Sequence, residues 1–228
     1  SVAVLDKETL PRAKTCGGLI SSRALQLLPP PIWTRVPGSQ PVNTIQVFRG
    51  KESYSYEESS PLGILVNRAD FDTAVARYAA GCGAVLLEGW KLQSLTGPSG
   101  AVNTNSCYTL EFVAAEGKAA STTVLQSRYV IAADGAAGFC AAAAGLRPPR
   151  RHLRLMGWGV CRELAATEAR SEKGSPGTIG FYPFPGLGGM GWSFPGKGLI
   201  NQGVGGLAPP AVLRRTLQGL FPESIEQD

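Results

Sequence analysis

Histidine is almost absent from this chain, with a single His152 among 228 residues. That scarcity disfavours a His-based metal site and a Ser-His-Asp catalytic triad, and we expect no metal ion. The cysteines are odd in number and contain no C-x-x-C pair, which argues against a disulfide framework or a structural zinc and for a reducing compartment. They are Cys16, Cys82, Cys107, Cys140 and Cys161. No apolar run reaches the length of a membrane span, and no signal peptide is visible.

Charged residues are also sparse, at 17% of the chain against 43% hydrophobic residues. This balance indicates a globular protein, long enough for one large domain or two interleaved ones. Part of the net charge of +5 comes from a basic cluster in "LRPPRRHLRL", around residues 147–154. We interpret the cluster as a solvated face between domains. The alternative, a site for anionic lipid or nucleic acid, stays open at this point, although we expect no nucleic-acid partner.

The opening segment "SVAVLD" lacks the feature that normally precedes such a segment. A short apolar run that ends in an acid is typical of a buried parallel strand in a dinucleotide-binding fold. There, the acid binds a ribose about twenty residues after a Gly-rich turn. No G-x-G-x-x-G precedes Asp6. Asp6 is therefore either an ordinary strand-end acid, or the phosphate-binding loop is missing. The first residue, which is not Met, and the abrupt end lead us to expect incomplete termini.

Hydrophobic periodicity predicts one clear amphipathic helix over 68–84, with Asp70 or Asp72 as its N-cap. A short helix over 21–28 and a helix over 211–221 are also predicted. Strands are predicted over 2–6, 43–50, 52–58, 62–66, 84–89, 107–115 and 121–134, and then in four Gly- and Pro-separated segments after residue 151. Those last four segments predict a mixed or antiparallel sheet.

Four pieces, in this order, resemble the geranylgeranyl reductase family of FAD-dependent oxidoreductases, within the aromatic-hydroxylase-like flavoproteins. They are "LPRAKTCGG", "RADFD", "VIAADGAAG" and "GMGWSFPGKGLINQGVGG". The resemblance implies a mixed α/β fold: an incomplete Rossmann-like FAD-binding domain (1–36 and 64–150) with an interleaved β-rich substrate domain (37–63 and 151–228). It also implies FAD as cofactor and NADPH or another reductant as electron donor.

The resemblance assigns cofactor-binding roles to several residues. Asp6 would bind the adenosine ribose, and in the family a cysteine at the place of Cys16 lies near the flavin. The full set is Asp6, Lys7, Arg12, Cys16, Gly17, Gly18, Arg68, Asp134 and Gly135. The two glycines would let the backbone approach a planar ligand such as the isoalloxazine.

Two of these assignments have plain structural alternatives. Cys16 is the candidate catalytic residue, since a thiol beside the flavin could orient substrate or relay a proton, but cysteine is also a small buried hydrophobe. Arg68 could bridge flavin-side loops or phosphates, or it could form a surface salt bridge with Asp70 or Asp72.

The segment after Asp134 departs from the family pattern. The family places a polar Ser or Asn there and usually an Arg beyond it, whereas this chain has Ala136, Ala137 and an apolar run. The departure weakens any assignment of a nicotinamide-cofactor site to this segment.

Aromatic residues near the C-terminal end resemble the substrate wall of these reductases. Tyr182, Trp192, Phe194 and Pro195 would line a narrow apolar slot for a prenyl chain. Ordinary sheet core is the alternative for each of them. "GWSFP" also resembles the W-x-W-x-I-P region of flavin-dependent halogenases, with Phe194 in place of the second Trp.

We therefore expect an FAD-dependent oxidoreductase that reduces C=C bonds of an isoprenoid or other lipid substrate. It would be cytoplasmic and could contact a membrane surface, or be plastidial if the source is eukaryotic. An FAD-dependent monooxygenase or halogenase is one alternative, and a truncated chain that only binds a hydrophobic ligand is another. In the doubly wound order 3-2-1-4, segments 2–6, 84–89 and 128–134 would be the second, third and fourth strands. The first strand and its Gly-rich turn would be missing, so we predict that this chain alone binds FAD weakly or not at all.

Overall fold

The computed structural model describes residues 1–97, 106–115, 121–135, 138–146, 157–165, 177–184, 186, 188–196 and 198–222. The basic cluster around His152, together with Ala136 and Ala137, lies outside these residues. The described chain forms two compact units: residues 1–12 with 79–153, and residues 13–78 with 154–228. We call them unit 1 and unit 2. The prediction of two interleaved domains, with its different boundaries, stays a prediction.

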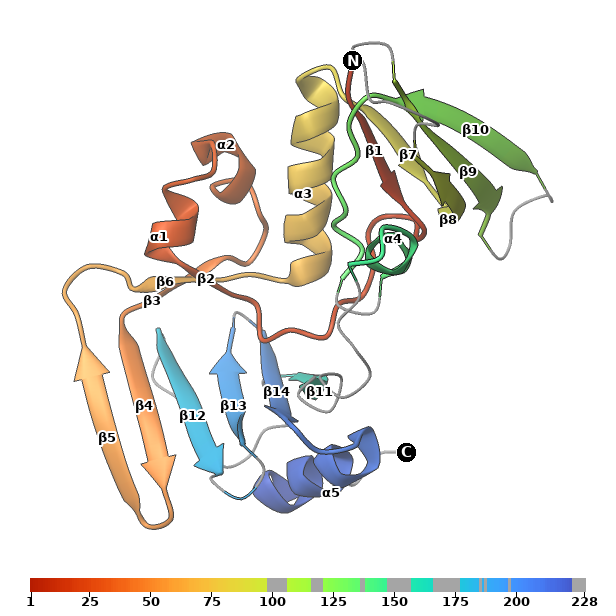
Figure 1. Ribbon diagram of the computed structural model, residues 1–228. Coiled ribbons are helices and arrows are strands. Elements are labelled where there is room, and N and C mark those ends of the chain that lie inside the picture. The colour runs from red at the N-terminus through yellow and green to blue at the C-terminus, as the bar shows by residue number, and fades with distance from the viewer. Residues whose placement is uncertain are drawn as a thin grey trace. The chain divides into compact units, whose positions relative to one another are not determined.

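Unit 1 is built on two small sheets (Figure 1). Strands β1 (Ala3–Asp6) and β7 (Val85–Glu88) pair in parallel, as expected for the second and third strands of a doubly wound sheet. The other sheet is antiparallel, in the order β10-β9-β8, and its strands are β8 (Trp90–Thr96), β9 (Tyr108–Ala114) and β10 (Thr122–Ser127). Sequence periodicity missed β8 and the short helix α4 (Phe139–Ala143).

The predicted strand over 121–134 is wrong in its second half. Strand β10 ends at Ser127, and the segment that follows leaves Tyr129 82% and Ile131 92% exposed. In the order 3-2-1-4, a fourth strand hydrogen-bonds to the first. Within the described residues, β1 has only β7 as a strand neighbour, so the apolar run 129–133 has no first strand with which to pair.

Unit 2 contains a mixed six-stranded sheet in the order β11-β14-β13-β12-β4-β5 (Figure 1). All neighbours are antiparallel except β12 and β4, which are parallel. The prediction of a mixed or antiparallel sheet is confirmed. The strands are β4 (Thr44–Arg49), β5 (Glu52–Glu57), β11 (Trp158–Ala165), β12 (Thr178–Phe184), β13 (Gly189–Pro195) and β14 (Leu199–Gly206).

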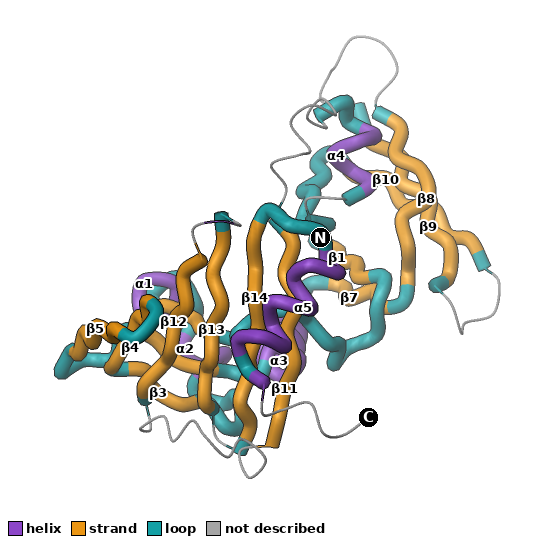
Figure 2. Tube along the Cα trace, turned by 90° about the horizontal axis from the view of Figure 1, so that it is seen from below, coloured by secondary structure: helices purple, strands orange, loops and turns teal. Residues whose placement is uncertain are grey.

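The two faces of this sheet are covered by different elements. Residues paired across neighbouring strands share a face, so Phe181, Trp192, Gly203 and Cys161 form one row. We call this the cavity face. The next row lies on the opposite face and contains Tyr182, Gly191, Val204 and Val160. Helix α5 (Pro210–Leu220) packs there through Leu213 and Leu217, and Figure 2 shows it lying across the strands. We call this the α5 face.

A small antiparallel sheet, in the order β2-β6-β3, packs on part of the cavity face. Its strands are β2 (Leu19–Ser21), β3 (Gln40–Val42) and β6 (Gly63–Leu65). Val42 and Leu65 are buried against Ile179 and Phe194 of the large sheet. The other side of the small sheet carries Ile64, which packs with residues of α1 (Ser22–Leu25), α2 (Pro30–Trp33) and α3 (Arg68–Gly81). Unit 2 is therefore layered as α5, large sheet, small sheet and helices.

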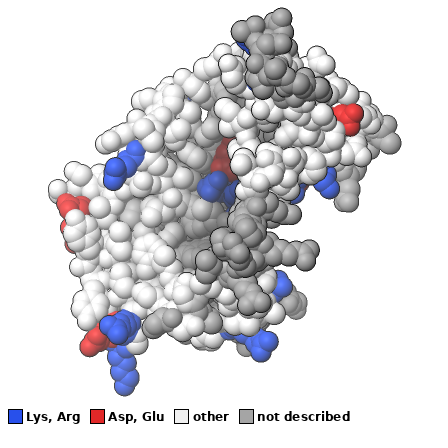
Figure 3. All heavy atoms as spheres, in the orientation of Figure 1, with Lys and Arg blue, Asp and Glu red and all other residues white. Residues whose placement is uncertain are grey.

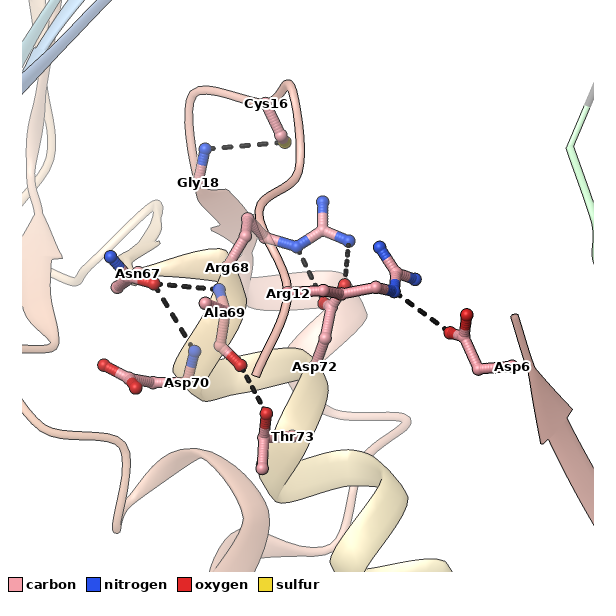
Figure 4. Close-up of polar contacts among 10 residues, drawn as sticks. All are labelled: Asp6, Arg12, Cys16, Gly18, Asn67, Arg68, Ala69, Asp70, Asp72 and Thr73. Atoms are coloured by element: carbon pink, nitrogen blue, oxygen red, sulfur yellow. Dashed lines mark hydrogen bonds and ion pairs between the residues drawn. The ribbon is translucent and has the colours of Figure 1, made fainter. Parts of the chain in front are cut away.

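Helix α3 forms where its periodicity predicts, but its cap differs. Asn67 Oδ1 accepts hydrogen bonds from the backbone N–H groups of Ala69 (2.8 Å) and Asp70 (3.4 Å), as Figure 4 shows. The prediction of Asp70 or Asp72 as N-cap is therefore wrong. Asn is as good a cap as Asp, and here it stands just before the first helical residue. No helix in the described part of the chain is long and apolar enough to span a membrane.

Candidate functional site

The Cys16-Gly17-Gly18 segment crosses the cavity face of the large sheet. Gly17 lies against Phe194: a Cβ added to Gly17 would stand 2.5 Å from Cδ2 and Cε2 of that ring. Two residues before Gly17, the methyl group of Thr15 lies near Gly159 of β11. The segment thus runs across β11, β14 and β13. It can lie this close to Phe194 because Gly17 has no side chain.

Gly18 is required for a different reason. Its φ of +83° lies in the left-handed region, and a Cβ there would collide with the carbonyl oxygen of Val66. The Gly18 carbonyl in turn accepts a hydrogen bond from Val66 N at 3.0 Å. Sequence reasoning interpreted both glycines as room for a flavin. In the structure, the space they free is filled by Phe194 and Val66 of the chain itself.

A buried amide, Asn201, ties this segment to the sheet. Asn201 is 8% exposed and accepts a hydrogen bond from Trp192 Nε1 at 2.8 Å. Its Nδ2 donates to the Cys16 carbonyl at 3.1 Å and to Glu163 Oε1 at 3.4 Å. Sequence reasoning missed Asn201. The only available signal was its place among apolar residues and glycines in "LINQGVGG", where a buried amide needs partners.

The Cys16 carbonyl binds Asn201, whereas its thiol contacts two other polar groups. Gly18 N–H donates to Cys16 Sγ at 3.5 Å, and the Arg68 guanidinium also contacts this thiol. Arg68 makes a two-point ion pair with Asp72, with Nε to Oδ1 at 2.9 Å and Nη2 to Oδ2 at 3.1 Å (Figure 4). The hydrogen bonds to Asp72 raise the pKa of Arg68, and this effect exceeds the lowering caused by its partial burial. The salt bridge weighed from sequence is therefore formed, with Asp72 and not with Asp70.

An apolar cavity of about 860 Å³ opens beside this segment. Cys16 and Gly17 form part of its lining, and the rest comes from the cavity face and from the strand ends and turns beside it. Met190 and Leu207 also line it and are 47% and 51% exposed, so apolar side chains reach the solvent-facing side of the cavity. The remaining lining residues are Gly157, Phe181, Pro183, Gly188, Gly189, Trp192, Phe194, Gly205 and Gly206.

Only two of the four predicted substrate-wall residues line this cavity. Trp192 and Phe194 do so, with ring centroids 6.4 Å apart. Tyr182 lies on the α5 face, stacked on Phe48 at 4.8 Å and edge-on to Phe221 at 5.1 Å. Pro195 also lies on that face because it follows Phe194 in the strand. Side chains of a strand alternate between faces, so residues of both parities cannot form one wall.

The predicted ribose acid, Asp6, stands in unit 1 at the carboxyl end of β1. Its Oδ2 accepts from Arg12 Nε at 3.0 Å, and its Oδ1 accepts from Glu8 N at 3.0 Å (Figure 4 shows the Arg12 contact). Lys7 forms an ion pair with the exposed Glu8, at 3.7 Å. Asp6 and Arg12 side chains are 27% and 24% exposed, so the carboxylate stays accessible to a ligand.

Asp134 is engaged by helix α4. Its Oδ2 accepts a hydrogen bond from Cys140 N at 2.8 Å, and this bond lowers the pKa of Asp134. Gly135 has a φ of +85°. Asp134 therefore accepts a hydrogen bond from the first turn of α4 in this structure, and its cofactor role stays a prediction. Among the described residues, no group of three or more His, Cys, Asp or Glu side chains could hold a metal ion.

Solved structures with a similar fold include flavoproteins. A geranylgeranyl bacteriochlorophyll reductase-like protein from Thermoplasma acidophilum matches with a TM-score of 0.71 at 16% identity, over 98% of this chain and 55% of that one. A flavoprotein/dehydrogenase from Cytophaga hutchinsonii matches with a TM-score of 0.67 at 16% identity, over 94% and 51%. The halogenase PltM, in complex with phloroglucinol and FAD, matches with a TM-score of 0.63 at 14% identity, over 99% and 53%.

The chain has the fold of FAD-dependent flavoproteins. It spans about half the length of these solved structures. No protein-family model matches the sequence, and no curated protein is significantly similar to it. The neighbours include both a reductase-like protein and halogenases, so the fold is compatible with more than one flavin chemistry.

Proposed function

We propose that this chain is part of an FAD-dependent oxidoreductase that reduces a C=C bond in a long isoprenoid chain. One observation carries the proposal: an apolar cavity is bounded by the Cys16-Gly17 segment on one side and by Trp192 and Phe194 on another. The fold shared with a geranylgeranyl reductase-like protein supports it. NADPH or another reductant is proposed as the electron donor.

The residues of unit 1 fit one part of the cofactor. Among the described residues, each oxygen of the Asp6 carboxylate accepts from one donor, which leaves acceptor capacity for ribose hydroxyl groups. Arg12 offsets the carboxylate's charge. No described strand pairs with the second edge of β1, where the first strand of the doubly wound order would stand. The Gly-rich turn that follows such a strand is therefore not among the described residues, and FAD binding by this chain is expected to be weak.

The residues of unit 2 would serve the substrate. Trp192 and Phe194 offer apolar contact to a prenyl chain, which a bound chain would complete by displacing water from the apolar lining. Cys16 is one of the lining residues, and its thiol, beside Gly18 N–H and Arg68, is proposed to hold a proton for the reacting carbon. Reduced FAD supplies hydride when bound.

An FAD-dependent halogenase or monooxygenase is the second candidate. The structural match to PltM supports it, as does the resemblance of "GWSFP" to the halogenase segment. Phe194 counts against it, because it replaces the second Trp of that segment. A third reading, a chain that only binds a hydrophobic ligand, needs no cofactor.

Flavin titration and an anaerobic assay together test these alternatives. The chain is first titrated with FAD, followed by flavin fluorescence. At saturating FAD and with chemically reduced flavin, geranylgeranyl diphosphate is then added without oxygen, and the products are analysed by mass spectrometry. Gain of hydrogen at a double bond supports the proposal.

Three other results would contradict it. Halogenation of a phenol in air, with halide and no alkene reduction, would establish the second candidate. FAD binding with neither activity would remove the proposed substrate class. Binding of a fluorescent fatty acid that geranylgeranyl diphosphate does not displace, with no FAD binding, would establish the third reading.

A further inference from the structure

Strand β5 forms an open edge of the large sheet in unit 2. All six of its residues, Glu52–Glu57, are exposed. Figures 1 and 2 both show it at the end of the sheet, beyond β4. Among the described strands, β4 is its only neighbour. An edge of this kind offers backbone N–H and C=O groups to another strand unless the sequence blocks it, and no proline interrupts β5.

The hydrogen bonds of the β4–β5 hairpin show which backbone N–H and C=O groups of β5 point away from β4. Glu58 N donates to Asn43 O at 3.0 Å, in continuation of the register that pairs Thr44 with Glu57. Hydrogen-bonded and non-hydrogen-bonded pairs alternate in an antiparallel ladder. The even-numbered residues of β5 therefore bond to β4, while Ser53, Ser55 and Glu57 direct their N–H and C=O groups outward.

The side chains of this edge are complementary to themselves. Lys51 and Glu52 stand at one end and Glu57 and Glu58 at the other, with serine and tyrosine between them. Figure 3 shows charged side chains at both ends of the hairpin and uncharged ones in between. Tyr54 and Tyr56, 61% and 55% exposed, project on the same face and add apolar surface to the centre.

We propose that β5 pairs with β5 of a second copy of this chain, antiparallel and centred on Tyr54. In this register Lys51 faces Glu57 of the other copy, twice by symmetry, and Ser53 faces Ser55. The outward N–H and C=O groups of Ser53 and Ser55 then meet those of Ser55 and Ser53 in the other copy, while Lys51 reaches Glu57 from the turn that precedes β5. Centring on Ser55 also satisfies the backbone, but it sets Glu52 against Glu58 twice, and like charges opposite each other are unfavourable. A twofold interface needs a surface complementary to itself, which this charge order supplies.

Oligomeric state tests the proposal through a charge swap. The mass of the 228-residue chain is measured by light scattering from low micromolar to millimolar concentration. We expect a concentration-dependent dimer. Lys51→Glu and Glu57→Lys should each weaken the dimer by about fivefold or more, because attractive pairs become repulsive. The double variant K51E/E57K should recover the wild-type dimer, since the pairs are restored with opposite sign.

Two further variants locate the contact. Ser55→Pro removes an outward N–H without touching the ladder to β4 and should abolish the dimer, with the monomer's circular dichroism unchanged. Tyr54→Cys should form a disulfide between copies on mild oxidation, because residues of a non-hydrogen-bonded pair lie about 4.5 Å apart at Cα. Tyr56→Cys is the matched control, since it would face Glu52, and it should cross-link no faster than the wild-type chain.

Several results would overturn the proposal. A chain that stays monomeric at millimolar concentration has no such interface. A dimer that is insensitive to Ser55→Pro and to the charge variants uses another surface. Equal cross-linking of Tyr54→Cys and Tyr56→Cys would contradict the register. Binding of an added serine- and tyrosine-rich peptide without self-association would show that β5 serves another partner.

Discussion

The indole N–H of Trp192 donates a 2.8 Å hydrogen bond to Oδ1 of Asn201. Through the same amide, Trp192 is coupled to the Cys16 carbonyl, 185 residues away from Asn201 in sequence. One buried side chain therefore joins the Cys16-Gly17 segment to the aromatic wall of the cavity. The first prediction follows from this arrangement.

Replacing Asn201 should loosen both sides of the cavity. Asn201→Leu leaves the Trp192 N–H and the Cys16 carbonyl without their partner, at a cost of about 1–3 kcal/mol in the free energy of unfolding. Asn201→Asp keeps an acceptor for Trp192 but loses the donor to Cys16 and sets a charge beside Glu163. Urea denaturation and Trp fluorescence measure the two effects. A leucine variant as stable as the wild type would contradict this role.

Gly17 is expected to be intolerant of a side chain because of Phe194. Gly17→Ala places a methyl group 2.5 Å from the ring and should lower stability by about 1–3 kcal/mol, the usual cost of overpacking. The double variant G17A/F194L should recover part of the loss, because the shorter side chain makes room. Thermal unfolding of the wild type, Gly17→Ala, Phe194→Leu and the double variant measures the coupling energy between the two residues. Additive effects would show that the two residues do not meet.

Trp192 should matter most for long substrates, if the proposed function holds. Trp192→Ala removes half-buried apolar surface worth up to about 2 kcal/mol, and binding of a twenty-carbon prenyl diphosphate should weaken by up to about thirtyfold. A five-carbon diphosphate should bind nearly as before. Tyr182→Leu, on the α5 face, is the control. Equal losses for both substrates would indicate a folding role for Trp192.

Asp134 should make the stability of unit 1 sensitive to acid. The hydrogen bond from Cys140 N lowers the pKa of Asp134 in the folded chain, below the unfolded value of about 3.9. Its contribution is therefore present above that value and is lost as the pH falls through the folded pKa. The effect is small because Asp134 is exposed. Asp134→Asn should abolish it, as measured by hydrogen exchange of the Cys140 amide between neutral pH and pH about 3.

The local sequence pattern determined much of the secondary structure of this protein. The 3.6-residue period of "RADFDTAVARYAAG" and the β-branched and aromatic runs bounded by Gly and Pro are short-range signals, so helix α3 and most strands were predictable. The predicted strands over 43–50 and 52–58, adjacent in sequence, likewise correspond to the β4–β5 hairpin. The resemblance to flavoproteins also came from sequence, because its four pieces keep their order along the chain.

Only the tertiary structure decided what the site residues face. Whether Gly17 makes room for a ligand or for Phe194 depends on a residue 177 positions away (194 minus 17). Tyr182 and Trp192 lie on opposite faces of the sheet because of the register between their strands. A sequence motif contains no information on that register. Asp134 accepts a hydrogen bond from Cys140 N of helix α4, six residues further along the chain. The first two outcomes rest on pairing between distant segments, which local propensity does not encode.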